Sequence, residues 1–263
     1  MKVRMLGCGG SGGVPLVGGE WGACDPAEPR NRRRRASLLV ETASTTILID
    51  TSPDCRQQLL DAGTRRLDAV LYSHAHADHL HGIDDLRALN RLMRRPIAIH
   101  ADVDTMATIR RRFDYVFTPI EPGGSFYKPT AVANIIQGPF VVGDIRVVPF
   151  SQDHGFSTTL GFRIGPVAYS TDVVELDDKA FAALDGVAVW IVDCLRYEPH
   201  PTHSHLEKTL RWIERVKPRR AILTHMDVPL DYATLRRKLP AGVEPGYDGL
   251  TVDFGETRGK DFP

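Results

Sequence analysis

The stretch Ser73-His74-Ala75-His76-Ala77-Asp78-His79 decides how this sequence is interpreted. It places three imidazoles and a carboxylate directly after the apolar run 68–72, which has the character of a buried strand. Neutral imidazole nitrogens and carboxylate oxygens are good ligands for zinc, manganese or iron. A polar His-rich turn is the alternative. Because the cluster is internal and follows a strand, we predict a metal centre at the end of that strand.

Length and composition bound the fold class and the partners. A chain of 263 residues can bury a substantial core, and we predict one domain over 1–263. Lys plus Arg equals Asp plus Glu at 33 each, so no overall charge favours nucleic acid or a membrane surface. We expect no membrane partner, because no apolar run approaches the roughly 18 residues of a membrane span. Four scattered cysteines and the lack of a signal-peptide core favour a cytoplasmic protein.

Two further motifs each leave alternatives open. Gly7, Gly9 and Gly12 satisfy GxGxxG, but Pro15 follows where a nucleotide-binding helix would have to begin, so dinucleotide binding is disfavoured. The loop is then either a tight turn or a backbone that approaches a substrate anion near the metals. The basic run 30–35 is either a solvated face or a phosphate contact.

The same event recurs along the chain: an apolar strand ends and the next residues include His or Asp. Strands are predicted at 3–6, 37–41, 45–50, 68–72, 97–100, 140–142, 145–150, 159–164, 167–170, 187–193 and 221–224. Helices are predicted at about 54–62, 84–93, 103–113, 177–184, 206–216 and 232–239. Ligands at strand ends would meet along one edge of packed sheets. The strand-end residues are Asp50, the cluster 74–79, His154, Asp172 and His225.

This pattern resembles the metallo-β-lactamase superfamily, whose HxHxDH signature stands here at residues 74–79. The resemblance implies an α/β (α+β) fold, a four-layer αββα sandwich of two mostly antiparallel sheets between helices. It also implies two divalent ions, Zn²⁺ or Mn²⁺, with Asp172 bridging them and Asp50 supporting a ligand from behind. By motif match, His74, His76 and His154 would hold the first ion, and Asp78, His79 and His225 the second.

Within the superfamily, the chain is similar to the cyclic-phosphate phosphodiesterases of phosphonate breakdown and more distantly to the tRNA 3′-processing endonucleases. The former carry a cysteine cluster that binds a structural zinc, whereas only Cys24 stands in the matching segment here. The latter carry a basic, Gly-rich arm that this sequence lacks. The resemblance thus implies a metal-dependent hydrolase, a phosphodiesterase acting on a small cyclic phosphate or nucleotide-like phosphodiester. The alternatives are a tRNA 3′-processing-type endonuclease and a thioester or lactone hydrolase of the same fold.

Two residues are predicted to take part in the chemistry directly. His203 matches the branch's extra catalytic histidine and would protonate the leaving alkoxide. His200 and His205 are better explained as loop or helix-capping residues. Asp78 would orient the attacking water besides binding metal. We expect a small phosphate ester as the substrate rather than a large nucleic acid. The loop 119–129 is either a lid or a dimer contact, so a homodimer stays open.

Overall fold

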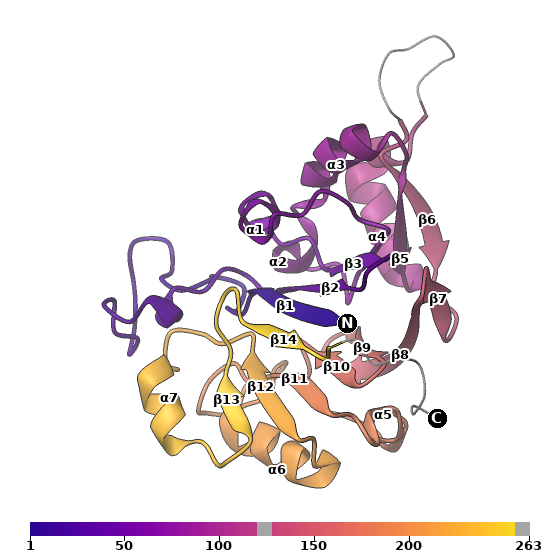
Figure 1. Ribbon diagram of the computed structural model, residues 1–263. Coiled ribbons are helices and arrows are strands. Elements are labelled where there is room, and N and C mark those ends of the chain that lie inside the picture. Colours follow the sequence, from indigo (N-terminus) through magenta and orange to yellow (C-terminus); the bar gives the residue numbers. More distant parts are fainter. Residues whose placement is uncertain (120–127, 256–263) are drawn as a thin grey trace.

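Two seven-stranded sheets pack face to face, with helices on both outer sides (Figure 1). The computed structural model describes residues 1–119 and 128–255. The strand orders are β14-β1-β2-β3-β4-β5-β6 and β13-β12-β11-β10-β9-β8-β7. The expected four-layer sandwich is confirmed. The sheets are mixed rather than mostly antiparallel, because helical crossovers connect the parallel strands β3 to β6 and β10 to β13.

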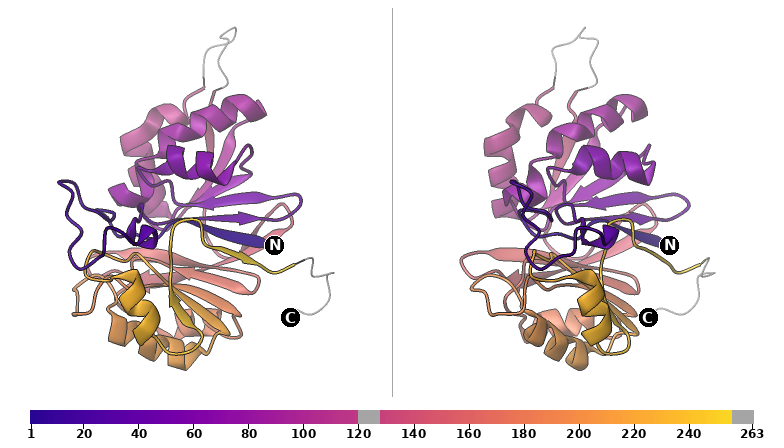
Figure 2. Two further views of the ribbon diagram at one scale, coloured as in Figure 1. Left: turned by 60° about the vertical axis from the view of Figure 1, so that its left-hand side comes forward. Right: turned by 90° about the vertical axis from the view of Figure 1, so that its left-hand side faces the viewer.

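The first half of the chain builds one sheet and the helices that cover it (Figure 2). Its helices are α1 (Cys55–Ala62), α2 (Ala77–Leu80), α3 (Leu86–Met93) and α4 (Val103–Phe113). The strand at Ala131–Ile135 was not predicted from the sequence. The loop 119–129, for which a lid or a dimer contact was predicted, lies largely outside the described residues. The strands are β1 (Lys2–Gly7), β2 (Ser37–Glu41), β3 (Thr46–Ile49), β4 (Ala69–Leu71), β5 (Ile97–Ala101), β6 (Ala131–Ile135) and, from the end of the chain, β14 (Thr251–Asp253).

The second half builds the other sheet in the same way. Helices α5 (Asp178–Leu184), α6 (Leu206–Val216) and α7 (Tyr232–Lys238) cover its outer face in Figure 1. All three begin within one residue of the predicted positions. The strands are β7 (Phe140–Val142), β8 (Ile145–Asp153), β9 (Thr158–Ile164), β10 (Val167–Ser170), β11 (Val189–Asp193), β12 (Arg220–Thr224) and β13 (Val243–Pro245).

Strand alternation divides the apolar side chains between two interiors. In β2, Leu38 and Val40 pack between the sheets, whereas Leu39 packs against the helices. In β3, Ile47 and Leu48 divide in the same way. Both faces of these strands are buried, which explains why their sequences are almost continuously apolar.

Strand direction brings the ligand-bearing ends together. Strands β3 and β4 are parallel, and so are β10, β11 and β12. Strand β8 runs in the same direction as β10, because both are antiparallel to β9. Carboxyl ends of parallel strands meet at one edge of a sheet, which is where α/β proteins place their ligands. The strand-end His and Asp residues therefore gather at one edge of the sandwich.

The glycine loop packs closely against neighbouring segments of the chain. The Gly9 amide donates to the Arg34 carbonyl at 2.8 Å, and the Gly10 amide donates to the Met226 carbonyl at 3.2 Å. These amides are therefore unavailable to a substrate anion. A Cβ at Gly7 would lie 2.1 Å from the Arg35 carbonyl oxygen, so close chain approach requires glycine there. This part of the loop is therefore a tight turn, while Ser11 lines the same hollow as His154 and His225.

The basic run 30–35 joins loops, which neither of its predicted roles anticipated. Arg33 is only 2% exposed, and its Nη2 donates to the Leu230 carbonyl at 2.6 Å. Arg34 pairs with Asp61 at 2.7 Å and Arg35 with Asp54 at 2.8 Å. Arg33, Arg34 and Arg35 therefore fasten the first loop to its neighbours, whereas Arg30 and Arg32 are exposed.

Replacing Arg33 with alanine should lower the free energy of unfolding by about 2–4 kcal/mol, because buried carbonyl acceptors lose a charged donor. Urea unfolding of the two proteins measures this difference. The exposed neighbour Arg32 is the matched control, and Arg32→Ala should change stability by less than about 1 kcal/mol. Equal losses in the two variants would contradict the anchoring role.

Candidate metal centre

Three imidazoles and a carboxylate form the first set of ligand atoms. His74 and His76 follow β4, and His154 follows β8 directly. With Asp172, which lies just past β10, their ligand atoms all lie within 4.8 Å of one another. The structure therefore brings together the residues predicted for the first ion.

A second set lies beside the first and shares Asp172 with it. It comprises Asp78, His79 and His225 in addition, with ligand atoms within the same 4.8 Å limit. Asp78 and His79 lie on the short helix α2, and His225 follows β12. The Asp78 Oδ2 atom lies 3.2 Å from His79 Nε2 and 3.4 Å from His225 Nε2. All seven predicted ligands thus reach one place.

The carboxylate of Asp172 stands between the two sets. Its Oδ1 lies 3.0 Å from His79 Nε2 and 3.3 Å from His225 Nε2. Its Oδ2 lies 3.7 Å from His74 Nε2 and 3.8 Å from His154 Nε2. Each oxygen therefore faces a different set of imidazoles, which is the arrangement that a bridging carboxylate requires.

The donor set fits divalent cations. The buried Nε2 atoms of His74 and His79 have no hydrogen-bond partner among the described residues. Leaving such an atom unpaired costs about 1–3 kcal/mol, a cost that a bound cation removes. Imidazole and carboxylate ligands suit zinc and manganese alike, so the site is consistent with two ions of either kind.

Charge is unevenly distributed over the two sets. Burial, together with the positive charge of His79, holds the pKa of His74 well below its ordinary value. Burial also opposes protonation of His225, but the carboxylates of Asp172 and Asp78 outweigh it and raise its pKa to about 9. The imidazole of His74 in the first set is therefore neutral, whereas the second set shares protons with its carboxylates. A cation entering the second set would replace those protons.

Asp50 supports the second set from behind, as predicted. Its Oδ2 lies 2.8 Å from His79 Nδ1, which directs His79 Nε2 toward Asp172. Ser73 holds that carboxylate in place, donating from its amide to Oδ1 at 2.8 Å and from its hydroxyl to Oδ2 at 2.7 Å. From its place at the end of a strand, Asp50 thus orients the ring of His79, one of the predicted ligands.

Several of these residues adopt left-handed backbone conformations. Asp50, Asp172 and His225 have φ values of 63°, 52° and 56°. Such conformations cost of order 1–3 kcal/mol in non-glycine residues and persist only where the surroundings impose them. The left-handed backbone at each of these strand ends directs the side chain across the edge of the sheet and toward the metal site.

His203 also lies at this site. Its Nε2 lies 3.9 Å from Asp172 Oδ2, and its Nδ1 lies 3.1 Å from Asp193 Oδ2. His200 and His205 belong to neither ligand set. His205 instead occupies the N-cap position of α6.

Asp193 is the site residue that the sequence argument missed. It is the last residue of β11 and fully buried, and it also accepts a hydrogen bond from the Val173 amide at 3.0 Å. Its Oδ1 has no hydrogen-bond partner among the described residues and lies 4.0 Å from His225 Nδ1. It therefore faces both His203 and His225. The signal was available, because Asp193 ends an apolar strand like the other strand-end residues.

The segment around Cys24 does not fit a structural zinc site. Its thiol donates to the Val228 carbonyl, with the two heavy atoms 3.3 Å apart. Asn31, beside it, donates from Nδ2 to Asp231 Oδ2 at 2.7 Å. None of the metal-ligand groups found in 1–119 and 128–255 includes Cys24. Hydrogen bonds to the loop after His225 hold this segment instead.

Comparison with known proteins places this geometry in a family. A model described as the Beta-lactamase superfamily domain matches residues 45–226, which carry every predicted ligand. The chain belongs to the metallo-β-lactamase superfamily. It is 37% identical over 269 residues to a protein of Porphyromonas gingivalis named octanoyltransferase. The match covers all of this chain, but the chain spans about half (54%) of that relative's length.

Two solved structures show how far the superfamily likeness extends. A diphosphatase of the PhnP family is 31% identical, with a TM-score of 0.88, and the match covers 95% of this chain and 96% of that one. Zn²⁺-bound PqqB from Methylobacterium extorquens is 18% identical, with a TM-score of 0.71, and the match covers 96% and 100% of the two chains. The second likeness shows the fold alone. No helix in the described part of the chain is long and apolar enough to cross a membrane.

Replacing Asp50 with asparagine should lower metal affinity about 10–100-fold at the second set, because His79 loses the acceptor that fixes its ring. Titration of metal-free protein against a competing chelator measures both affinities. The first set should keep its affinity, so the bound metal should fall from two ions toward one at limiting concentration. The exposed carboxylate of Asp84 provides the control variant, Asp84→Asn. Unchanged affinity in Asp50→Asn would contradict the supporting role.

Proposed function

We propose that this protein is a dinuclear metal-dependent phosphodiesterase that hydrolyses a small phosphate ester. The observation that carries the proposal is the Asp172 carboxylate, whose two oxygens face two complete sets of ligands with His203 beside them. Two divalent cations, when bound, supply Lewis acidity and lower the pKa of a coordinated water. The 31% identity to a PhnP-family diphosphatase supports phosphorus chemistry.

His203, Asp193 and Asp78 have different roles in an in-line displacement at phosphorus. The water gives up a proton to solvent, its oxygen forms a bond to phosphorus, and the bond from phosphorus to the leaving oxygen breaks. His203 Nε2 gives a proton to that leaving oxygen, while Asp193 Oδ2, 3.1 Å from His203 Nδ1, fixes the orientation of the ring. Asp78 lies between His79 and His225, where its carboxylate also orients the attacking water. Loss of Asp78 would remove a ligand as well, so mutation does not separate its two roles.

One comparison favours a second candidate, a thioester hydrolase. The relative named octanoyltransferase matches this chain over its whole length. About half of that protein lies outside the match, so its name does not tell which part carries the activity. A thioester hydrolase would use the same cations but needs no proton donor for its leaving thiolate. A tRNA-processing role has less support, since the net charge of the chain is zero.

Metal removal followed by reconstitution tests the proposed function. Metal-free protein should be inactive, and Zn²⁺ or Mn²⁺ should restore hydrolysis of bis(p-nitrophenyl) phosphate and of cyclic nucleotides. An acyl thioester is assayed in parallel under the same conditions. Activity on the thioester alone would support the second candidate. Metal-loaded protein without phosphodiesterase activity would overturn the proposal.

A His203→Ala variant tests the proton donor. It should lose about 100-fold or more in kcat on a diester with an alkyl leaving group, because the alkoxide leaves unprotonated. The loss should be much smaller for a p-nitrophenyl ester, whose phenolate leaves readily without a proton. Metal content, measured by mass spectrometry, should stay unchanged.

His205→Ala is the matched control, because His205 belongs to neither ligand set. It should retain full activity on both esters. If His203→Ala loses metal and activity together, or loses both esters equally, the assignment of His203 as the proton donor is wrong.

A further inference from the structure

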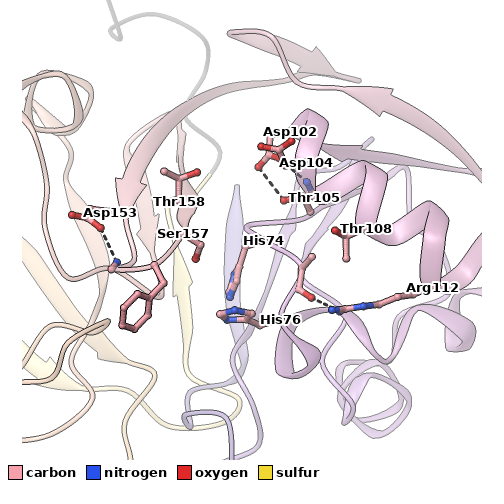
Figure 3. Close-up of a pocket in the computed structure, with 13 residues that line it drawn as sticks. His74, His76, Asp102, Asp104, Thr105, Thr108, Arg112, Asp153, Ser157 and Thr158 are labelled. Atoms are coloured by element: carbon pink, nitrogen blue, oxygen red, sulfur yellow. Dashed lines mark hydrogen bonds between the residues drawn. The ribbon is translucent and has the colours of Figure 1, made fainter.

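A cavity opens beside the first set of ligands (Figure 3). Its volume is about 680 Å³, within the usual range for small-molecule sites, and His74 and His76 form part of its wall. It lies between α4 and the loop that joins β8 to β9. We refer to it as the α4 cavity, and its wall includes Asp104, Thr108 and Arg112 from α4 together with Phe156 and Ser157 from the loop.

The α4 cavity lies apart from the proton donor. His203 lines a separate hollow together with Asp172 and His225, and it is not part of the α4 cavity wall. A phosphodiester bound at the metals would therefore place its leaving group near His203. The other ester group, which stays on phosphorus, would extend toward α4.

Charge in the α4 cavity disfavours a second phosphate. Three carboxylates, of Asp102, Asp104 and Asp153, stand against the single guanidinium of Arg112. Asp102 accepts the Thr105 amide at 2.7 Å, and Asp153 accepts the Gly155 amide at 2.7 Å. Asp104 accepts no hydrogen bond from the described residues and sits in the first turn of α4. A free carboxylate in such a place accepts hydrogen bonds from sugar hydroxyls, as in ribose recognition by dinucleotide-binding folds.

Phe156 supplies a flat apolar surface at the junction of the two hollows. It lines both of them, yet 93% of its surface is exposed. Its backbone is fixed by the preceding glycine: Gly155 has φ +75°, and a Cβ there would lie 2.7 Å from the Pro201 carbonyl oxygen. The ring is therefore exposed to solvent beside the two hollows, where a flat ligand group can stack on it.

We propose that the α4 cavity binds the ester group that stays on phosphorus and selects an uncharged, hydroxyl-bearing group with a flat face, of which a nucleoside is the simplest. Asp104 accepts its hydroxyls, and Phe156 stacks on its ring. The carboxylates select against a further phosphate on that group. This inference rests on the proposed phosphodiesterase function and adds the specificity of the same site.

Two esters with the same leaving group isolate the contribution of the α4 cavity. Uridine 5′-(p-nitrophenyl phosphate) carries the proposed group, and methyl p-nitrophenyl phosphate lacks it. The Mn²⁺-loaded wild-type protein should prefer the uridine ester by about tenfold or more in kcat/KM. Phe156→Ala and Asp104→Asn should each lose about tenfold on the uridine ester and nothing on the methyl ester, a loss in the range of one stacked base.

A charge test and a control complete the experiment. A 3′-phosphate added to the uridine ester should lower kcat/KM in the wild type and less so in Asp104→Asn. Leu92→Ala, on α3 and outside the cavity wall, should leave both esters unchanged. Equal hydrolysis of the two esters by the wild type, or equal losses on both in the variants, would overturn the subsite and leave the phosphodiesterase function standing. Hydrolysis of neither ester by the wild type would overturn both proposals.

Discussion

The carboxylate of Asp172 is the element on which the site depends. It is buried at the end of β10, its backbone is held in a left-handed conformation, and its two oxygens face opposite groups of imidazoles. The surrounding imidazoles hold its pKa well below the ordinary value against the opposing effect of burial. A negative charge buried in this way needs positive partners on both sides. Two divalent cations, one on each side of the Asp172 carboxylate, would supply those positive partners.

The two halves of the chain each supply part of that arrangement. The first sheet carries Asp50 and the 74–79 cluster, and the second carries His154, Asp172, Asp193 and His225. Parallel strands within each sheet bring these residues to one edge, and the face-to-face packing brings the two edges together. The buried Arg33 fastens the first loop to the segment after His225, and so ties the halves together next to the site.

Most of the ligand set could be predicted from sequence, because each ligand follows an apolar strand and the HxHxDH spacing is specific. Asp193 was missed because it was counted as the last residue of its strand rather than as a strand-end residue that faces the site. Its contact with His203, ten residues further along the chain, depends on the conformation of the loop after β11, which residue patterns do not encode. The burial of Arg33 could not be predicted, because it depends on carbonyls about 200 residues away in sequence. The parallel pairing within the sheets could not be predicted either, because the alternation of side chains along a strand does not show in which direction its neighbour runs.

The most direct measurement is the anomalous diffraction of crystals loaded with Zn²⁺ or Mn²⁺. The account predicts two anomalous peaks, one on each side of the Asp172 carboxylate. The first should be ringed by His74, His76 and His154, and the second by Asp78, His79 and His225. A single peak, or ions bound elsewhere with Asp172 uncoordinated, would contradict the claim that this carboxylate bridges two metals.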